Sequence, residues 1–235
     1  MIIPQLEQGL AALGVQAPPE AVEKLDRYAQ LLLEKNQVMN LTAITDPDQV
    51  ASLHMLDSAA LLNTADLREK RLVDVGTGAG FPGMVLKILS PTLDVTLLDS
   101  LAKRLDWLEE VQAELGLTGV HTVHARAEEY AAGNRESFDI AVSRAVAALP
   151  MLAELCLPLV KVGGVFLAMK SVDSGEDLAA AGRAIQILGG RVEEQADYAI
   201  PGTEIRHRAI VIRKAERTPE KYPRAFAKIK KRPLA

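Results

Sequence analysis

The sequence predicts an α/β fold in which a mostly parallel, seven-stranded sheet carries helices on both faces and follows an N-terminal helical extension. From Arg71 onward, short apolar runs alternate with segments whose apolar residues recur at helical spacing, which is the pattern of parallel strands joined by helices. Before Arg71 only the helical spacing occurs. Apolar residues make up 49% of the chain and charged residues 25%, a composition that permits a sizeable core.

The extension is expected to contain three helices. In the second of them Leu25, Tyr28 and Leu32 fall on one face. Asp46 followed by Pro47 is a favourable start for the third, because Asp caps a first turn and Pro fits its first position. The expected helices occupy about 4–14, 19–36 and 46–63.

The region after the extension alternates between the two kinds of segment. At each boundary the spacing of apolar residues changes between a period of about 2, typical of strands, and a period of about 3.6, typical of helices. The expected helices are 84–89, 103–115, 152–160, which Pro158 ends or kinks, and 178–188. The expected strands are 72–75, 94–98, 120–124, 138–142, 164–169, 191–198 and 207–212. We therefore divide the chain into an extension (1–66), an α/β domain (67–215) and a basic C-terminal tail (216–235).

The most informative segment is the glycine loop, which we define as residues 73–83. The strand ending at Val75 runs into Gly76, Gly78 and Gly80. Glycines there permit a tight turn and close approach of a ligand to the backbone. Residues 78–83 fit the dinucleotide pattern G-x-G-x-x-G, but that pattern begins two residues too late for the strand. The pattern that begins directly after the strand is Gly76-x-Gly78-x-Gly80, preceded by Asp74. It resembles the first motif of class I, Rossmann-like methyltransferases that use S-adenosylmethionine. A glycine turn without a ligand is the alternative.

Asp99 ends the next strand, 19 residues after Gly80. A carboxylate at about 20 residues' spacing accepts hydrogen bonds from ribose hydroxyls, and it would repel the extra phosphate of NADP. The structural alternative is a cap for the helix that follows Leu101.

Charge is distributed unevenly along the chain. The net charge is −4, but residues 206–232 contain 11 Lys/Arg and two acids, which leaves 16 cations against 29 acids elsewhere. A basic tail suggests contact with a polyanion, and a solvated, frayed end is the alternative. Cys156 is the one cysteine, which excludes an intrachain disulfide and a cysteine-based zinc site. No apolar run approaches the ~18–20 residues needed to cross a membrane, and no leader pattern is visible. We therefore expect a cytoplasmic protein without membrane or metal partners, and a monomer.

The chain resembles the bacterial 16S rRNA (guanine-N7) methyltransferase G family, also called the glucose-inhibited division protein B family. The resemblance covers the chain from about Asn36 to the tail. It rests on the glycine loop and on the segments Leu97–Arg104, Asn40–Thr42, His54–Ser58, Ser143–Ala145 and Lys221–Arg224.

The resemblance implies methylation of N7 of the guanine called G527, in the 530 loop of 16S rRNA, within the small ribosomal subunit or its assembly intermediate. It implies S-adenosylmethionine as methyl donor and S-adenosylhomocysteine as product. The expected cofactor contacts are Gly76, Gly78, Gly80, Phe81, Asp99, Ala127, Glu128 and Arg144. The expected RNA contacts are Lys170, Arg206, Lys221, Arg224, Lys228, Lys230, Lys231 and Arg232.

Guanine N7 carries an in-plane lone pair and no proton, so it can attack a sulfonium methyl group without a general base. The enzyme then has to hold the reacting atoms in line. We expect Arg144, His54 and Asp57 to act in positioning; His54 and Asp57 share a helix face and otherwise form a structural pair. Deletion of residues 221–235 is expected to weaken RNA methylation and leave cofactor binding intact.

Three other functions compete with this interpretation. An NAD-dependent dehydrogenase would use the literal dinucleotide pattern, but no second substrate domain is evident. A non-catalytic RNA-binding or assembly factor would not require the glycine loop with Asp99. A methyltransferase acting on a small molecule or protein is the third alternative, and the basic tail favours RNA over it.

Overall fold

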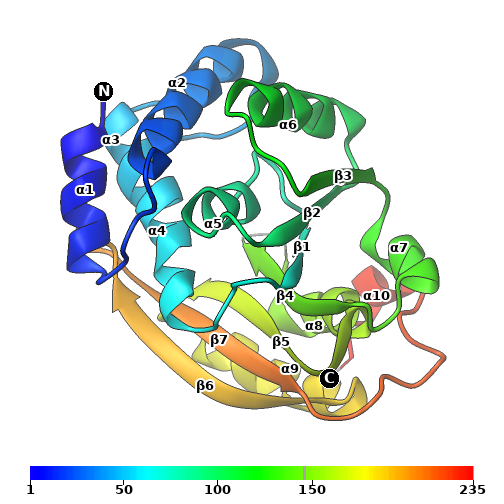
Figure 1. The fold of residues 1–235 in the computed structure, drawn as a ribbon. Coiled ribbons are helices and arrows are strands. Elements are labelled where there is room, and N and C mark those ends of the chain that lie inside the picture. The colour runs from blue at the N-terminus through cyan, green and yellow to red at the C-terminus, as the bar shows by residue number, and fades with distance from the viewer. Residues whose placement is uncertain (145–146, 235) are drawn as a thin grey trace.

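The computed structural model describes residues 1–144 and 147–234, and in them seven strands form one sheet of order β3-β2-β1-β4-β5-β7-β6 (Figure 1). The first five strands of that order pair in parallel, whereas β7 is antiparallel to both of its neighbours. The predicted mostly parallel sheet is confirmed. The strands are β1 Arg71–Val75, β2 Asp94–Asp99, β3 Val120–His124, β4 Phe138–Arg144, β5 Val160–Ser171, β6 Gly190–Ala199 and β7 Arg206–Lys214.

The N-terminal extension is helical, as expected. Its last part is one continuous helical segment that includes a π-helical stretch, and Asp46 caps it by accepting a hydrogen bond from the Gln49 amide at 2.9 Å. π-helical turns often occur at functional sites, and this one contains His54. The elements are α1 Ile3–Ala12, α2 Ala21–Met39, α3 Pro47–Val50, η1 Ala51–Leu56, α4 Asp57–Ala59 and η2 Ala60–Asn63.

Two helices after the extension are ones that the sequence did not predict: α7, between β3 and β4, and α10, after the last strand. Both are short, so they lack the repeated apolar spacing that identifies a helix. The helix before Pro158 ends at Cys156 and continues as a 3₁₀ turn, η3. The elements are α5 Gly83–Leu89, α6 Ala102–Glu114, α7 Ala127–Gly133, α8 Leu149–Cys156, η3 Leu157–Leu159, α9 Gly175–Ile187 and α10 Phe226–Lys231.

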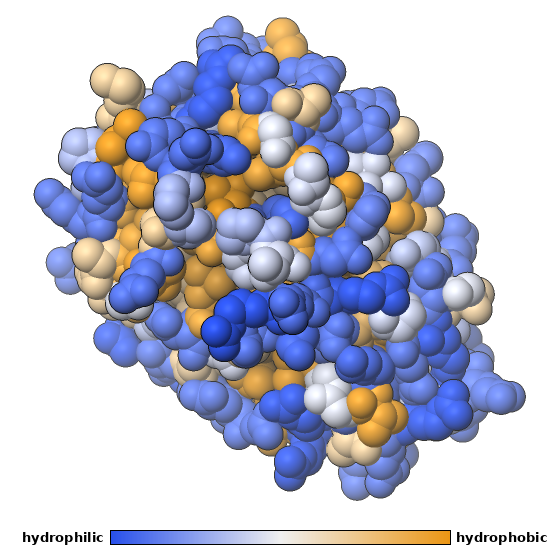
Figure 2. Space-filling view, in the orientation of Figure 1, coloured by the Kyte–Doolittle hydropathy of each residue, from blue (hydrophilic) through white to orange (hydrophobic). Residues whose placement is uncertain are grey.

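Each face of the sheet packs against its own set of helices, so the molecule has two core layers (Figure 1). Leu72 lies in one apolar cluster with residues of α1, α2, α5 and α6. Val73, its neighbour in β1, lies in the other cluster with residues of α8, α9 and α10. Successive strand residues point to opposite faces, which is why nearly all of β1 is buried. Figure 2 shows that hydrophilic side chains cover most of the face seen in Figure 1, with smaller apolar areas between them.

The C-terminal tail packs onto the domain. Ile229 of α10 is fully buried, and Arg224 pairs with the buried Glu154 of α8 at 2.5 Å. Arg135 donates to the carbonyl of Tyr222 at 2.6 Å. These contacts hold the tail against α8 and the segment that follows α7, and Phe226 of α10 lines one cavity together with Gly76 of the glycine loop.

Of the helices in the described residues, none combines the length and the apolar character needed to cross a lipid bilayer.

Candidate active site

The glycine loop joins β1 to α5 at the carboxyl end of the parallel strands. Gly76, Gly78 and Gly80 have φ angles of 73°, 58° and 91°, a region that only glycine adopts without strain. The Gly76 amide donates to the Leu98 carbonyl at 2.8 Å, which ties the loop to β2. The fold therefore fixes an open backbone turn where nucleotides bind in sheets of this type.

Asp74 holds the inner side of this loop. Its Oδ2 accepts hydrogen bonds from the Thr77 hydroxyl at 2.7 Å and from the Gly83 amide at 2.9 Å. Its Oδ1 is buried and has no hydrogen-bond partner among the described residues. Burial raises the pKa of Asp74 to about 6, because the charged carboxylate loses its hydration.

The N-terminal extension supports the loop from the other side. Tyr28 of α2 donates a hydrogen bond to the carbonyl of Ala79, and its ring stacks on Phe81 with centroids 5.3 Å apart. A Cβ atom at Gly80 would lie 2.3 Å from the Tyr28 hydroxyl, so glycine is required there on steric grounds as well. The sequence marked Tyr28 only as part of an apolar helix face and did not reveal this role.

Asp99 accepts a backbone hydrogen bond with each of its carboxylate oxygens. Its Oδ1 accepts from the Leu101 amide at 2.9 Å, and its Oδ2 accepts from the Gly78 amide at 2.9 Å. The N-cap residue of α6 is Leu101 and not Asp99, so the capping alternative is wrong, and the ribose contact stays a prediction. Arg104 makes a longer contact with Oδ2, 3.3 Å. A carboxylate offers about four lone-pair positions. The three donors use three of them, which leaves room for one hydroxyl group of a ligand. A second ligand hydroxyl would have to displace Arg104.

Two cavities meet at the glycine loop. The larger, about 430 Å³, is lined by Phe81, His54 and Arg144 among others. The smaller, about 150 Å³, is lined by Ala127 and Glu128 of α7 among others. Both cavities are lined by Gly76, Asp99 and Ser100. The structure therefore brings all the predicted cofactor residues to one place except Gly80, which lies beneath the loop against Tyr28 and α6.

Arg144, at the end of β4, connects the sheet to the extension. Its Nη1 donates to Asp57 Oδ2 at 3.2 Å and to the Leu53 carbonyl at 3.0 Å. Its Nη2 donates to His54 Nδ1 at 3.0 Å, and its guanidinium lies 5.1 Å from the centre of the Phe81 ring. Arg144, His54 and Asp57, the predicted positioning residues, thus form one cluster in which Arg144 bridges the other two. Ala145, part of one family match, lies outside the described residues.

Asp57 is almost completely buried and organises the rest of this cluster. Its Oδ1 accepts from the Tyr198 hydroxyl at 2.8 Å and from His207 Nδ1 at 2.9 Å. Burial and the Asp57 charge raise the pKa of Tyr198. Tyr198 and His207 come from β6 and β7, and nothing in the sequence identified them as site residues.

His54 is neutral, and both of its ring nitrogens are engaged. Burial and the adjacent Arg144 lower the pKa of His54 to about 4. Since Arg144 can only donate, Nδ1 of His54 accepts, and the ring proton lies on Nε2. Nε2 then donates to the Thr42 hydroxyl at 2.8 Å. Neither ring nitrogen of His54 is therefore free to act as a general base, and its positioning role stays a prediction.

A third cavity, about 460 Å³, lies on the far side of Arg144 and His54. Arg144 and His54 line both this cavity and the larger cavity at the loop, so they form the wall between the two. Ile44, Leu53 and Met169 provide apolar surface, while Lys170 and His207 add polar groups. A ligand in this cavity would lie next to a ligand at the glycine loop.

The predicted RNA contacts fall into two groups. Lys170 pairs with Asp177 at 2.8 Å, and Arg224 pairs with Glu154, so the structure gives both side chains an internal partner. The predicted RNA contacts of Lys170 and Arg224 stay predictions. The others are exposed: Arg206 begins β7, Lys221 precedes α10, and the remaining residues are Lys228, Lys230, Lys231 and Arg232. Among the described residues, no group of three or more His, Cys, Asp or Glu side chains is arranged to hold a metal ion.

A mostly parallel sheet with an antiparallel β7, whose first strand enters this glycine loop and whose second strand ends in Asp99, defines a class I methyltransferase that uses S-adenosylmethionine. Solved structures agree on the fold. TrmN from Thermus thermophilus superposes with a TM-score of 0.55 and 23% identity, over 69% of this chain and 49% of that one. A mutant of MtNAS in complex with S-adenosylmethionine gives a TM-score of 0.56 and 16% identity, over 91% of this chain and 78% of that one.

Sequence comparisons identify the family. The family model described as rRNA small subunit methyltransferase G matches residues 21–206. Ribosomal RNA small subunit methyltransferase G of Alkaliphilus oremlandii is 47% identical over 232 residues, 97% of each protein. The protein of the same name from Acetivibrio thermocellus is 46% identical over 231 residues, 97% of this chain and 95% of its own. This chain belongs to the small-subunit rRNA methyltransferase G family, and the resemblance seen in the sequence is confirmed.

Proposed function

We propose that the protein transfers a methyl group from S-adenosylmethionine to N7 of a guanine in 16S rRNA, the guanine called G527. The observation that carries this proposal is the wall formed by Arg144 and His54. It separates the glycine-loop cavity, suited to the methyl donor, from a second cavity of about 460 Å³. A base in the second cavity would be next to the donor methyl group.

We infer that the cofactor extends across the glycine loop. Its ribose would lie at Asp99, where the two loop cavities meet, with the adenine against Ala127 and Glu128. The methionine end would then lie in the larger cavity near Phe81 and Arg144. This arrangement assigns each predicted cofactor residue a contact or, for Gly80, a supporting position.

The chemistry of the second cavity favours a base that needs no deprotonation. His54 has both ring nitrogens in hydrogen bonds, and Asp57 accepts three hydrogen bonds. Neither group is free to remove a proton, and guanine N7 carries none. Apolar walls with a few polar groups suit a flat base that has left its stack. Positioning of sulfur, methyl group and N7 is then the protein's contribution.

The deciding experiment is transfer of tritiated methyl groups to small ribosomal subunits from a strain that lacks this activity, followed by mapping of the modified base. We expect label at N7 of one guanine in the 530 loop. Subunits from the parent strain, already modified, should accept none. Label at another base, or on protein, would contradict the proposal.

A further inference from the structure

The smaller cavity at the glycine loop has one wall that comes from the C-terminal tail. Phe226, the first residue of α10, lines it opposite residues of the sheet and α7. The Phe226 ring is half-buried, and the guanidinium of Arg126 lies 4.9 Å from its centre. We propose that Phe226 closes the adenine end of the cofactor site and so couples cofactor binding to the position of the basic tail.

The position of Phe226 is fixed from both sides. Two residues earlier, Arg224 is held by Glu154 of α8, which is completely buried. Three residues later, Ile229 is inserted into the core layer that contains Val75 and Leu98. Leu155, the neighbour of Glu154, lines the same cavity as Phe226. The tail is thus anchored so that its aromatic ring faces the cavity that we assign to adenine.

The cavity matches a flat, apolar ring with a polar edge. Val75, Leu98 and Leu155 supply apolar surface, and Glu128 supplies an acceptor for an exocyclic amine. An aromatic side chain in such a wall stacks with a nucleobase and contributes free energy without demanding a particular hydrogen bond.

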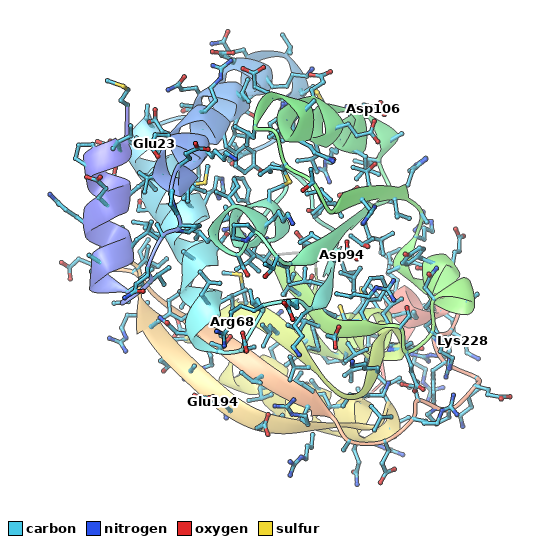
Figure 3. The ribbon with its side chains drawn as sticks, viewed as in Figure 1. Glu23, Arg68, Asp94, Asp106, Glu194 and Lys228 are labelled. Atoms are coloured by element: carbon cyan, nitrogen blue, oxygen red, sulfur yellow. The ribbon has the colours of Figure 1, made fainter. Side chains whose placement is uncertain are left out.

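The same short helix presents cations to solvent. Lys228, Lys230 and Lys231 are exposed on α10, and Figure 3 labels Lys228 at the side of the molecule where α7 lies. Because Phe226 and these lysines share one helix, an adenine ring that packs on Phe226 also holds the lysines in place. By linkage, any ligand that fixes the lysines would in turn favour the cofactor. The earlier expectation that the tail affects RNA alone is therefore revised: removal of residues 221–235 should weaken cofactor binding too.

This inference rests on the proposed placement of the cofactor, so the experiment tests both separately. Calorimetry on the full chain measures affinity for S-adenosylhomocysteine and for 5′-methylthioadenosine, which lacks the amino-acid end. We expect Phe226→Ala to weaken both ligands by a similar factor, about tenfold, which corresponds to about 1.4 kcal/mol. Phe226→Leu preserves apolar packing but not the flat face of the ring. Its affinity for both ligands should fall several-fold. Ala227→Gln, an exposed change on the same helix, is the matched control and should bind as the parent does.

Limited trypsin digestion tests the coupling. S-adenosylhomocysteine should slow cleavage after Lys228, Lys230 and Lys231 in the parent and in Ala227→Gln, but not in Phe226→Ala. Ala127→Leu fills the same cavity from α7. If Ala127→Leu weakens binding while both Phe226 variants bind normally and their tails stay protected, the inference about Phe226 is wrong and the cofactor placement stands. If Ala127→Leu also binds normally, the placement itself is wrong.

Discussion

Arg144 and His54 are 90 positions apart in the sequence, yet Nη2 of Arg144 lies 3.0 Å from Nδ1 of His54. This contact joins the end of β4 to the helical extension and forms the wall between the proposed donor cavity and the proposed base cavity. Four predictions concern this wall, Asp74 in the glycine loop, Asp99 at the end of β2, and the tail.

Arg144→Lys should reduce methyl transfer by roughly 10²-fold, because lysine keeps the charge near Asp57 but cannot bond His54, Leu53 and Asp57 together. Calorimetry with S-adenosylhomocysteine should show a smaller loss of cofactor affinity. Arg68→Lys is the matched control, since Arg68 is exposed and pairs only with Asp66 among the described residues. Parent-like turnover in Arg144→Lys would show that Arg144 does not position the reactants.

The stability of the protein should depend on two buried groups with opposite responses to pH. His54, with its pKa lowered to about 4, stabilises the fold above about pH 6.5, and this contribution is lost as the pH falls towards 4. Asp74, with its pKa raised to about 6, stabilises the fold below about pH 4, and this contribution is lost as the pH rises through 6. Each contribution is about 3 kcal/mol, so in the parent the two largely cancel.

Urea unfolding between about pH 4 and about pH 7 checks this balance. In His54→Gln the free energy of unfolding should fall as the pH rises, because only the Asp74 response remains. In Asp74→Asn it should rise with pH, because only the His54 response remains. If the free energy of unfolding changed with pH in the same direction in both variants, the assignment of the two responses to His54 and Asp74 would be wrong.

Asp99→Asn should weaken S-adenosylhomocysteine binding roughly 10- to 100-fold, because a charged acceptor for ribose hydroxyls contributes about 1.5–3 kcal/mol. Asp94→Asn is the control at the other end of β2 (Figure 3), where Asp94 pairs with His121 at 2.8 Å. We expect calorimetry to show that Asp94→Asn binds S-adenosylhomocysteine with the affinity of the parent. Equal affinities of the two variants would place the ribose elsewhere.

Combined replacement of Lys228, Lys230 and Lys231 by alanine should weaken RNA substrate binding and make it less sensitive to salt. Each lost phosphate contact lowers the slope of log K against log salt by about 0.7–0.9, so a reduction of about 2–3 is expected. Binding assays across a salt series measure it. Since Phe226 is retained, affinity for S-adenosylhomocysteine without RNA should be unchanged. An unaltered slope would remove α10 from the RNA interface.

The sequence alone determined the features that depend on neighbouring residues. The alternation of short apolar runs with helical segments predicts the seven strands and the longer helices in their order, but not the short α7 and α10, and glycines directly after Val75 mark the loop. Asp99 was identified by its spacing from that loop. These signals are local, because backbone conformation and side-chain period are set within a few residues.

Tertiary structure decided which distant side chains meet. Tyr28 reaches Ala79, Asp57 binds Tyr198 and His207, and Phe226 reaches the cavity at Ala127. None of these pairings leaves a trace in spacing or composition, because each partner also fits an ordinary role in its own helix or strand. Only the packing of the extension and the tail against the sheet brings them together. That packing encloses the glycine loop in cavities that the extension and the tail help to line.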